Sequence, residues 1–153
     1  MRKMIKFLLF SLVIILFLNG CSAKNESQDI FQYKDSFVGD NSAVGNIVNQ
    51  LQSGEHLVGF ELKTKEKPYG MILNYDWSES ESVYKETAIY NATFIFALVQ
   101  NVDWITFNFD NQEYTITKEK LQESYGIELS KFKNEDELRK LTEEFLGNTN
   151  KGN

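Results

Sequence analysis

Cysteine, histidine and proline each occur once in the 153 residues, which leaves several kinds of chemistry little to draw on. A single cysteine excludes an internal disulfide, so the folded part must be held together by its core. One histidine provides one imidazole for acid–base work, and the usual zinc ligand sets need more histidines or cysteines. The glycines also lack the spacing of a phosphate-binding loop. We therefore predict no metal and no cofactor.

Basic residues are scarce beyond the N-terminus. Residues 1–20 hold three cations and no acid, so the remaining 133 residues carry 13 Lys and Arg against 22 Asp and Glu, a net charge of −9. Nucleic-acid affinity comes largely from cations that neutralise phosphates, so we expect no nucleic-acid partner. Anionic lipid headgroups would repel such a domain as well. The length suffices for one domain with a sizeable core.

A short apolar run occupies residues 7–18 and follows the cations Arg2, Lys3 and Lys6. A basic start, a short apolar stretch and small residues at its end are typical of a secretory signal peptide. The run is too short for a membrane-spanning helix, which needs about 20 residues. The same length disfavours the alternative of an uncleaved signal anchor.

The end of this run, residues 18–21 (LNGC), resembles a bacterial lipobox. The resemblance implies cleavage between Gly20 and Cys21 and a thioether-linked diacylglycerol, with acyl chains such as palmitate, on Cys21. Two acyl chains hold a protein stably at a membrane, whereas one chain binds only marginally. We expect a lipoprotein anchored to the extracytoplasmic face of the cell membrane.

The chain divides by composition into four parts. The polar stretch after Cys21 lacks periodicity and predicts a flexible tether, and the last residues are polar as well. The predicted parts are a signal peptide (1–20), a tether (21–32), a globular domain (33–147) and a disordered tail (148–153).

Apolar periodicity predicts two hairpins separated by a helix. Residues 57–64 alternate, with Val58, Phe60 and Leu62 on one face, and residues 70–77 alternate again after a turn containing Pro68. The next long segment, 86–100, favours a buried helix, although its Thr, Ile and Phe residues would also suit a strand. Residues 102–109 alternate before Asp110 and Asn111, which suit a tight hairpin turn, and Tyr114 and Ile116 continue on the returning strand.

Capping residues mark three further helices. Asp40 or Asn41 begins the first, which Gly54 ends; Thr117 and Gly126 bracket another; Asn134, three residues before Glu137, begins the last. Together these elements predict one α+β domain. Its antiparallel four-stranded sheet would come from the two hairpins, with the helices packed mainly on one face.

Candidate catalytic and metal-binding residues are few. His56 follows Glu55 in a predicted turn and is typical of a solvated loop histidine. The acids Asp76, Glu79, Glu81 and Glu86 surround a Ser-rich loop and offer oxygen ligands for Ca²⁺, but without the spacing of a known calcium loop. The sequence also leaves open a catalytic pair of carboxylates that are distant in sequence, as in glycoside hydrolases.

Aromatic residues favour binding over catalysis. Tyr69, Trp77 and Trp104 lie on or near predicted strands, and exposed Trp and Tyr are typical interface anchors. Trp104 alternates with Ile105, so it belongs to the outer face of the sheet if Ile105, Phe107 and Phe109 face the core. The alternative is that a loop or the N-terminal segment covers Trp104. We predict a possible interaction surface at these three residues.

Several segments together resemble one family of bacterial extracytoplasmic domains, catalogued as domain of unknown function 4825. The similar segments are 33–42, 44–46, 61–64, 68–70, Tyr75, 101–103, 105–107 and 125–126. The resemblance implies small lipoproteins of low-GC Gram-positive bacteria, and domains attached to membrane sensors or peptidase-like proteins. It implies no catalytic residue.

Three functions follow as expectations, in order. The first is a non-enzymatic interaction or sensing domain that contacts an envelope component or a membrane protein. The second is a small-ligand-binding lipoprotein associated with a transporter, although about 115 folded residues are few for a two-lobed binder. The third is a hydrolase.

Overall fold

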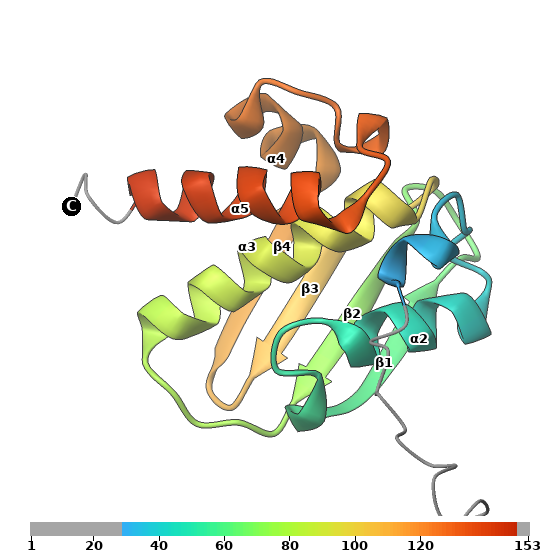
Figure 1. The fold of residues 1–153 in the computed structure, drawn as a ribbon. Coiled ribbons are helices and arrows are strands. Elements are labelled where there is room, and N and C mark those ends of the chain that lie inside the picture. The colour runs from blue at the N-terminus through green and yellow to red at the C-terminus, as the bar shows by residue number, and fades with distance from the viewer. Residues whose placement is uncertain (1–28, 150–153) are drawn as a thin grey trace, which may run out of the picture.

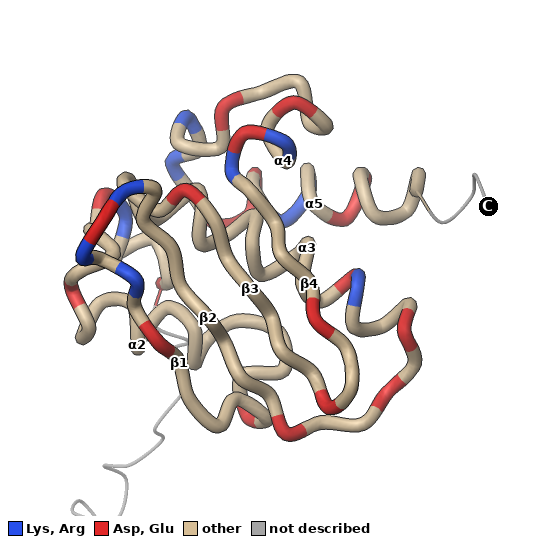
Figure 2. Tube along the Cα trace, turned by 180° about the vertical axis from the view of Figure 1, so that it is seen from behind, with Lys and Arg blue, Asp and Glu red and all other residues tan. Residues whose placement is uncertain are grey.

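The helices lie on one face of a single four-stranded sheet and leave its other face uncovered (Figures 1 and 2). The computed structural model describes residues 29–149. The elements form one α+β domain, as expected. The strands are β1 (Leu57–Lys63), β2 (Gly70–Tyr75), β3 (Trp104–Phe109) and β4 (Gln112–Thr117), in the order β1-β2-β3-β4.

The sheet is mixed, so the expectation of an antiparallel sheet is wrong at its centre. Both hairpins are antiparallel, but β2 and β3 pair in parallel, with Gly70 opposite Trp104 and Tyr75 opposite Phe109. After β2 the chain returns through α3 (Glu81–Leu98) to the end where β2 began. A helical crossover of this kind joins parallel neighbours. Local alternation predicts each hairpin but carries no information on how the hairpins pair.

The long central helix is buried on nearly every side. Its buried positions run from Tyr84 to Leu98, because the sheet lies on one side and α5 (Glu135–Thr149) lies against it on another (Figure 1). A helix that is apolar all round lacks a clear amphipathic period, which explains the helix–strand ambiguity of this segment. The helix begins five residues before the expected 86, because its first turn is exposed and polar.

Lysines donate to carbonyls at the C-terminal end of this helix and just beyond it. Lys34 Nζ donates to Ala97 O at 3.3 Å, and Lys118 Nζ donates to Val99 O at 3.4 Å and to Gln100 O at 2.9 Å. Burial lowers the pKa of Lys118, and nearby Asp103 opposes that effect. Positive charges at a helix C-terminus also interact favourably with the helix dipole.

The predicted caps at Asp40, Thr117, Gly126 and Asn134 are confirmed. Asp40 accepts from Ala43 N at the start of α2 (Asn41–Gln50), and Thr117 accepts from Lys120 N at the start of α4 (Lys118–Tyr125). Gly126 adopts a left-handed conformation after α4, as a helix-ending glycine should. Asn134 accepts from Glu137 N and begins α5.

Two sequence expectations near α2 and β1 are wrong. Gly54 does not end α2, which stops at Gln50; instead it begins a short 3₁₀ helix, Gly54–His56. Val58 is 68% exposed and does not share the core side of Phe60, because a β-bulge between Leu57 and Gly59 shifts the alternation. Leu57 takes the inward position in its place.

Folded structure begins before the predicted boundary at residue 33. Ile30 and Phe31 are buried within a 3₁₀ helix, Ile30–Tyr33, so the expected tether is too long by at least these residues. At the other end α5 continues to Thr149, two residues beyond the expected limit of the domain. The predicted signal peptide, Gly20 and Cys21 lie outside the described residues. Within residues 29–149, no helix is long and apolar enough to cross a membrane.

Candidate interaction surface

We define the outer face as the sheet surface opposite the helices. The pairing register assigns to it three residues from each strand, and none of the described helices lies over it (Figure 2). Its residues are Gly59, Glu61 and Lys63 of β1, Gly70, Ile72 and Asn74 of β2, Trp104, Thr106 and Asn108 of β3, and Glu113, Thr115 and Thr117 of β4.

Trp104 lies on the outer face, on the opposite side of β3 from Ile105. A Cβ built on Gly70 would fall 2.1 Å from Trp104 Cε2, so the indole lies directly over that glycine. Because glycine has no side chain, the ring can lie against the strand backbone, and Gly70 is buried beneath it. Trp104 itself is only partly buried.

The turn between β1 and β2 fixes the edge of this indole. Trp104 Nε1 donates to Pro68 O at 3.1 Å. Next to it, Tyr69 N donates to Asp103 Oδ2 at 2.8 Å, and Asp103 N donates to Tyr69 O at 2.8 Å. These contacts tie the two hairpins together at one end of the sheet. The structure thus brings two of the three predicted interaction residues, Tyr69 and Trp104, to one corner.

Paired polar side chains occupy the centre of the outer face. The Thr106 and Thr115 hydroxyls are hydrogen-bonded at 2.8 Å, and Asn108 Nδ2 donates to Asn74 Oδ1 at 2.8 Å. Each pair joins directly neighbouring strands, since cross-strand partners on one face lie close together. The hydrogen bonds fix the positions of these side chains. Thr106 is buried, so further donors and acceptors come from the exposed Thr115 hydroxyl and the two partly buried amides. Sequence reasoning missed the asparagine pair because the parallel register of β2 and β3 creates it.

Trp77, the third predicted interaction residue, lies elsewhere. It follows the far end of β2 and packs edge-on against Tyr84 and Phe109, with ring centroids 5.8 and 6.2 Å away. His56 stacks on its other side at 5.4 Å with an interplanar angle of 7°. Trp77 is thus part of an aromatic cluster at the edge of the core and does not share a surface with Trp104.

His56 shows no catalytic arrangement among the described residues. Its side chain is 39% exposed, and its Nε2 lies 3.7 Å from Glu55 Oε1. No serine or threonine hydroxyl of the described part of the chain hydrogen-bonds to this imidazole. Its ring stacks on Trp77, which is a packing contact.

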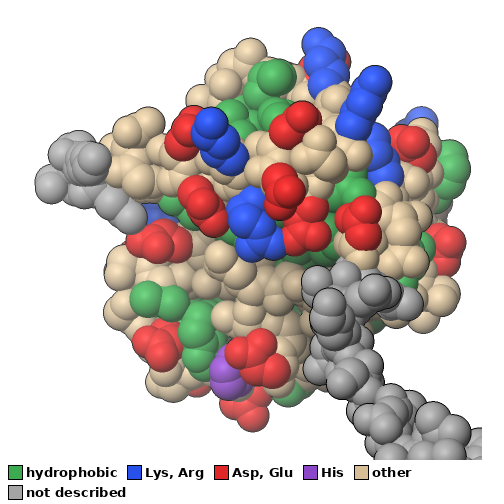
Figure 3. Space-filling model, in the orientation of Figure 1, with side chains coloured by type: hydrophobic (Ala, Val, Ile, Leu, Met, Phe, Trp, Pro, Cys, Tyr) green, Lys and Arg blue, Asp and Glu red, His purple; other side chains and the backbone are tan. Residues whose placement is uncertain are grey.

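The acids considered for Ca²⁺ are not gathered into a site. Across residues 29–149, no group of three or more His, Cys, Asp or Glu side chains is placed to hold a metal ion. Asp76, Glu79 and Glu81 follow one another along the exposed loop and the first turn of α3. Charged side chains of both signs also spread over the helix face around α5 (Figure 3).

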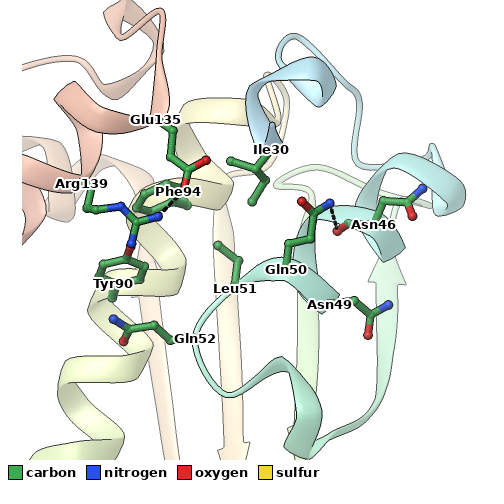
Figure 4. A pocket seen from close by; sticks show the side chains of 10 residues that line it. All are labelled: Ile30, Asn46, Asn49, Gln50, Leu51, Gln52, Tyr90, Phe94, Glu135 and Arg139. Carbon is green, nitrogen blue, oxygen red and sulfur yellow. Dashed lines mark hydrogen bonds and ion pairs between the residues drawn. The ribbon is translucent and has the colours of Figure 1, made fainter. Parts of the chain in front are cut away.

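A cleft of about 610 Å³ opens between α2, α3 and α5. On one side Arg139, Tyr90 and Glu135 point toward one another, and α2 contributes amides on the opposite side (Figure 4). Arg139 Nη1 donates to Tyr90 Oη at 2.9 Å, and Nη2 pairs with Glu135. Burial raises the pKa of Tyr90, and Arg139 opposes this rise. The positive charge in the cleft is already engaged by these neighbours.

The comparisons with known proteins give a family but no activity. A family model described as a domain of unknown function (DUF4825) matches residues 30–119. This stretch runs from the first 3₁₀ helix to the start of α4 and includes the whole sheet. No curated protein and no solved structure matches the chain.

Proposed function

Because this chain belongs to the DUF4825 family and its outer sheet face is open, we propose that it is a binding or sensing domain of the cell envelope. It is anchored to the extracytoplasmic face of the cell membrane through lipid on Cys21. It carries out no reaction itself and contacts an envelope partner through the outer face around Trp104.

The observation that carries this proposal is the partly exposed Trp104, held over Gly70 on an uncovered sheet face. Tryptophan anchors are enriched where proteins bind partners. A one-sided sheet leaves its second face to solvent or to a partner. The lipobox-like residues before Cys21 supply the location, since they place the domain outside the membrane.

Photocrosslinking in cells tests the proposal. A photoreactive residue replaces Thr115, an exposed position of the outer face, and a matched control replaces Asn49, an exposed position of α2. We expect the Thr115 probe to capture an envelope component and the Asn49 probe to capture none. If neither probe, or only the helix-face probe, yields a product, the outer face is not the binding surface.

A second candidate function rests on the cleft between α2, α3 and α5. Its volume, about 610 Å³, lies in the range of small-molecule sites. A small ligand bound there would make the chain a ligand-binding lipoprotein that serves a transporter. A rise in melting temperature with one class of envelope precursor, abolished by Gln50→Ala, would favour this function over the first.

A hydrolase is the third candidate. A histidine-based mechanism needs a nucleophile within hydrogen-bond reach of the imidazole. The stacked position of His56 on Trp77 gives such a mechanism no support.

A further inference from the structure

We infer that the partner of the outer face is an uncharged polysaccharide of the cell envelope. This inference rests on the proposed function, because it uses the same face, and it adds the chemical class of the partner. Three properties of the face lead to it. Its centre is uncharged, its apolar area is small, and it combines one aromatic ring, that of Trp104, with amides and hydroxyls in fixed positions.

The centre of the outer face carries no charge. Neither β2 (GMILNY) nor β3 (WITFNF) contains a charged residue, and the two strands show neither sign along their length in Figure 2. On β1, Lys63 Nζ is paired with Glu61 Oε2 at 2.6 Å. Glu113 on β4 is the remaining outer-face acid. An anionic polymer needs cations to bind, and this face has one lysine that is already paired.

The face also lacks the apolar centre that a protein partner requires. The buried core of a protein–protein interface is more apolar than the surrounding surface. Here Trp104 and Ile72 provide large apolar side chains, and the exposed Val58 adds a third at the β1 bulge. Thr106, Asn74 and Asn108 lie among them. A protein docking on this surface would bury polar groups around three separate apolar residues. The composition therefore disfavours a protein as the partner.

The same arrangement suits a sugar chain. The ring face of tryptophan carries negative charge in its quadrupole, and the C–H groups on one side of a sugar ring carry small positive charge. The indole of Trp104 lies over Gly70 and is only partly buried, so part of it is accessible to a ligand. Hydroxyl groups at the edge of a sugar need donors and acceptors in fixed positions, which the asparagine and threonine pairs provide.

The geometry extends these contacts in a line. Trp104, Thr106 and Asn108 alternate along β3. The Trp104 ring and one member of each polar pair therefore lie in a row on one strand. Same-face residues of a strand are about 7 Å apart, so the three positions span about 14 Å. An extended polymer of several sugar units can contact Trp104 and Asn108 at the two ends of this row, and the exposed Thr115 beside the buried Thr106 between them.

Retention on insoluble polysaccharides tests the inference. The full chain, purified in detergent, is applied to chitin, cellulose and mannan particles, which are uncharged, and to heparin beads, which are anionic. We expect retention on at least one uncharged polysaccharide, and this retention should persist from about 0.05 to about 0.5 M salt because no ion pairs are involved. No retention is expected on heparin.

Variants then locate the binding surface. We expect Trp104→Ala to weaken retention by about tenfold or more, the size of a binding hot spot. Asn108→Ala should weaken it severalfold and keeps the inference testable if the tryptophan variant fails to fold. The matched controls are Trp77→Phe in the aromatic cluster and Asn49→Ala on α2, which should bind like the parent.

The inference is overturned if the parent is retained on none of the three uncharged polysaccharides, if salt abolishes its retention, or if Asn108→Ala and Asn49→Ala behave alike. The Thr115 crosslinking experiment separates this failure from that of the proposed function. Capture of a protein at Thr115 without polysaccharide retention would overturn the inference and leave the binding domain standing. Absence of both signals would overturn both.

Discussion

At the scale of single residues, Asn91 joins three parts of the described core. It is fully buried in the middle of α3, where its Oδ1 accepts from Gln52 N at 3.1 Å and its Nδ2 donates to Gln52 O at 2.9 Å. Nδ2 also lies 3.2 Å from Tyr75 Oη on β2. The amide thus holds the segment after α2 against both the helix and the sheet.

Replacing Asn91 by Leu should destabilise the fold, although the two side chains differ little in volume. Leucine has a similar volume but leaves the backbone groups of Gln52 without their partners. We expect a loss of about 2–3 kcal/mol in the free energy of unfolding, since unpaired buried polar groups cost about 1–3 kcal/mol. The measurement is urea unfolding followed by circular dichroism.

Asn49→Ala is the matched control for this variant. Asn49 is exposed and bonds only to Gly45 O one turn back. Its loss should change stability by less than about 0.5 kcal/mol, as for most surface substitutions. Equal effects of the two asparagine substitutions would contradict the role assigned to Asn91.

The buried Tyr75 should make the free energy of unfolding depend on pH in the alkaline range. Burial raises its pKa from 10.0 to about 12, partly offset by the bond from Asn91. Between these values the unfolded chain releases a proton that the folded chain keeps. Stability is therefore complete below pH 10 and falls as the pH rises toward 12, with a slope of at most about 1.4 kcal/mol per pH unit from this group.

Tyr75→Phe removes this contribution, because phenylalanine does not ionise. The parent should lose stability more steeply than the variant between about pH 10 and pH 12, since the other tyrosines titrate in both proteins. Urea midpoints at several alkaline pH values check this. Parallel curves for the parent and the variant would show that Tyr75 does not titrate with the expected shift.

At the scale of elements, the packing of the Trp104 ring of β3 against the backbone of β2 depends on Gly70. Gly70→Ala places a methyl group 2.1 Å from the Trp104 ring, so the indole must move off the sheet. We expect a loss of about 1–3 kcal/mol, the usual cost of overpacking, and a red shift of Trp104 fluorescence as the ring enters water. Trp77→Phe as the background leaves Trp104 as the one fluorophore of this type.

Gly59→Ala provides the control on the same face of the sheet. A Cβ at Gly59 meets nothing within 4 Å, so alanine fits without displacement. Alanine should leave stability unchanged or raise it by up to about 1 kcal/mol, because glycine loses more conformational freedom on folding. If Gly59→Ala and Gly70→Ala cost the same, the effect belongs to strand glycines in general and not to the stacked indole.

The elements also show how far the sequence alone can lead. Helix ends at Asp40, Thr117, Gly126 and Asn134 could be predicted because each cap is a local hydrogen bond or backbone conformation. The parallel pairing of β2 with β3 could not, because it depends on the path of α3 across the sheet. The bulge at Val58 was missed for a related reason: strict alternation assumes a regular strand.

The residues of the candidate surface could likewise be predicted only in part from the sequence. Alternation around Ile105 could assign Trp104 to a face but not say whether that face is covered. Tyr69 and Trp104 meet because the β1–β2 turn and the start of β3 lie at one end of the sheet. Trp77 was grouped with them only because β2 was predicted two residues too long. The asparagine pair depends on a register that no local pattern encodes.

At the scale of the whole molecule, charge and location are linked. The helix layer carries acids and lysines, while the middle of the sheet face is uncharged (Figures 2 and 3). Without residues 1–20 the chain has a net charge of −9, so an anionic membrane surface repels it. In the proposed function, the lipid on Cys21, which precedes the described residues, therefore supplies the attraction to the membrane.

Cys21→Ala should therefore release the chain from the membrane. Each buried CH₂ of an acyl chain contributes about 0.8 kcal/mol, so removing two chains removes the stable anchor. In fractionated cells we expect the parent in the membrane pellet and labelled by a palmitate analogue. The variant should carry no label, and any of it that is exported should be in the soluble fraction. Ser22→Ala keeps the thiol and should behave like the parent.

Two results would contradict this prediction. A Cys21→Ala variant that stays in the pellet with its label would show that the lipid is attached elsewhere. A variant that stays there without the label would show that another segment, such as the apolar run at 7–18, holds the chain to the membrane.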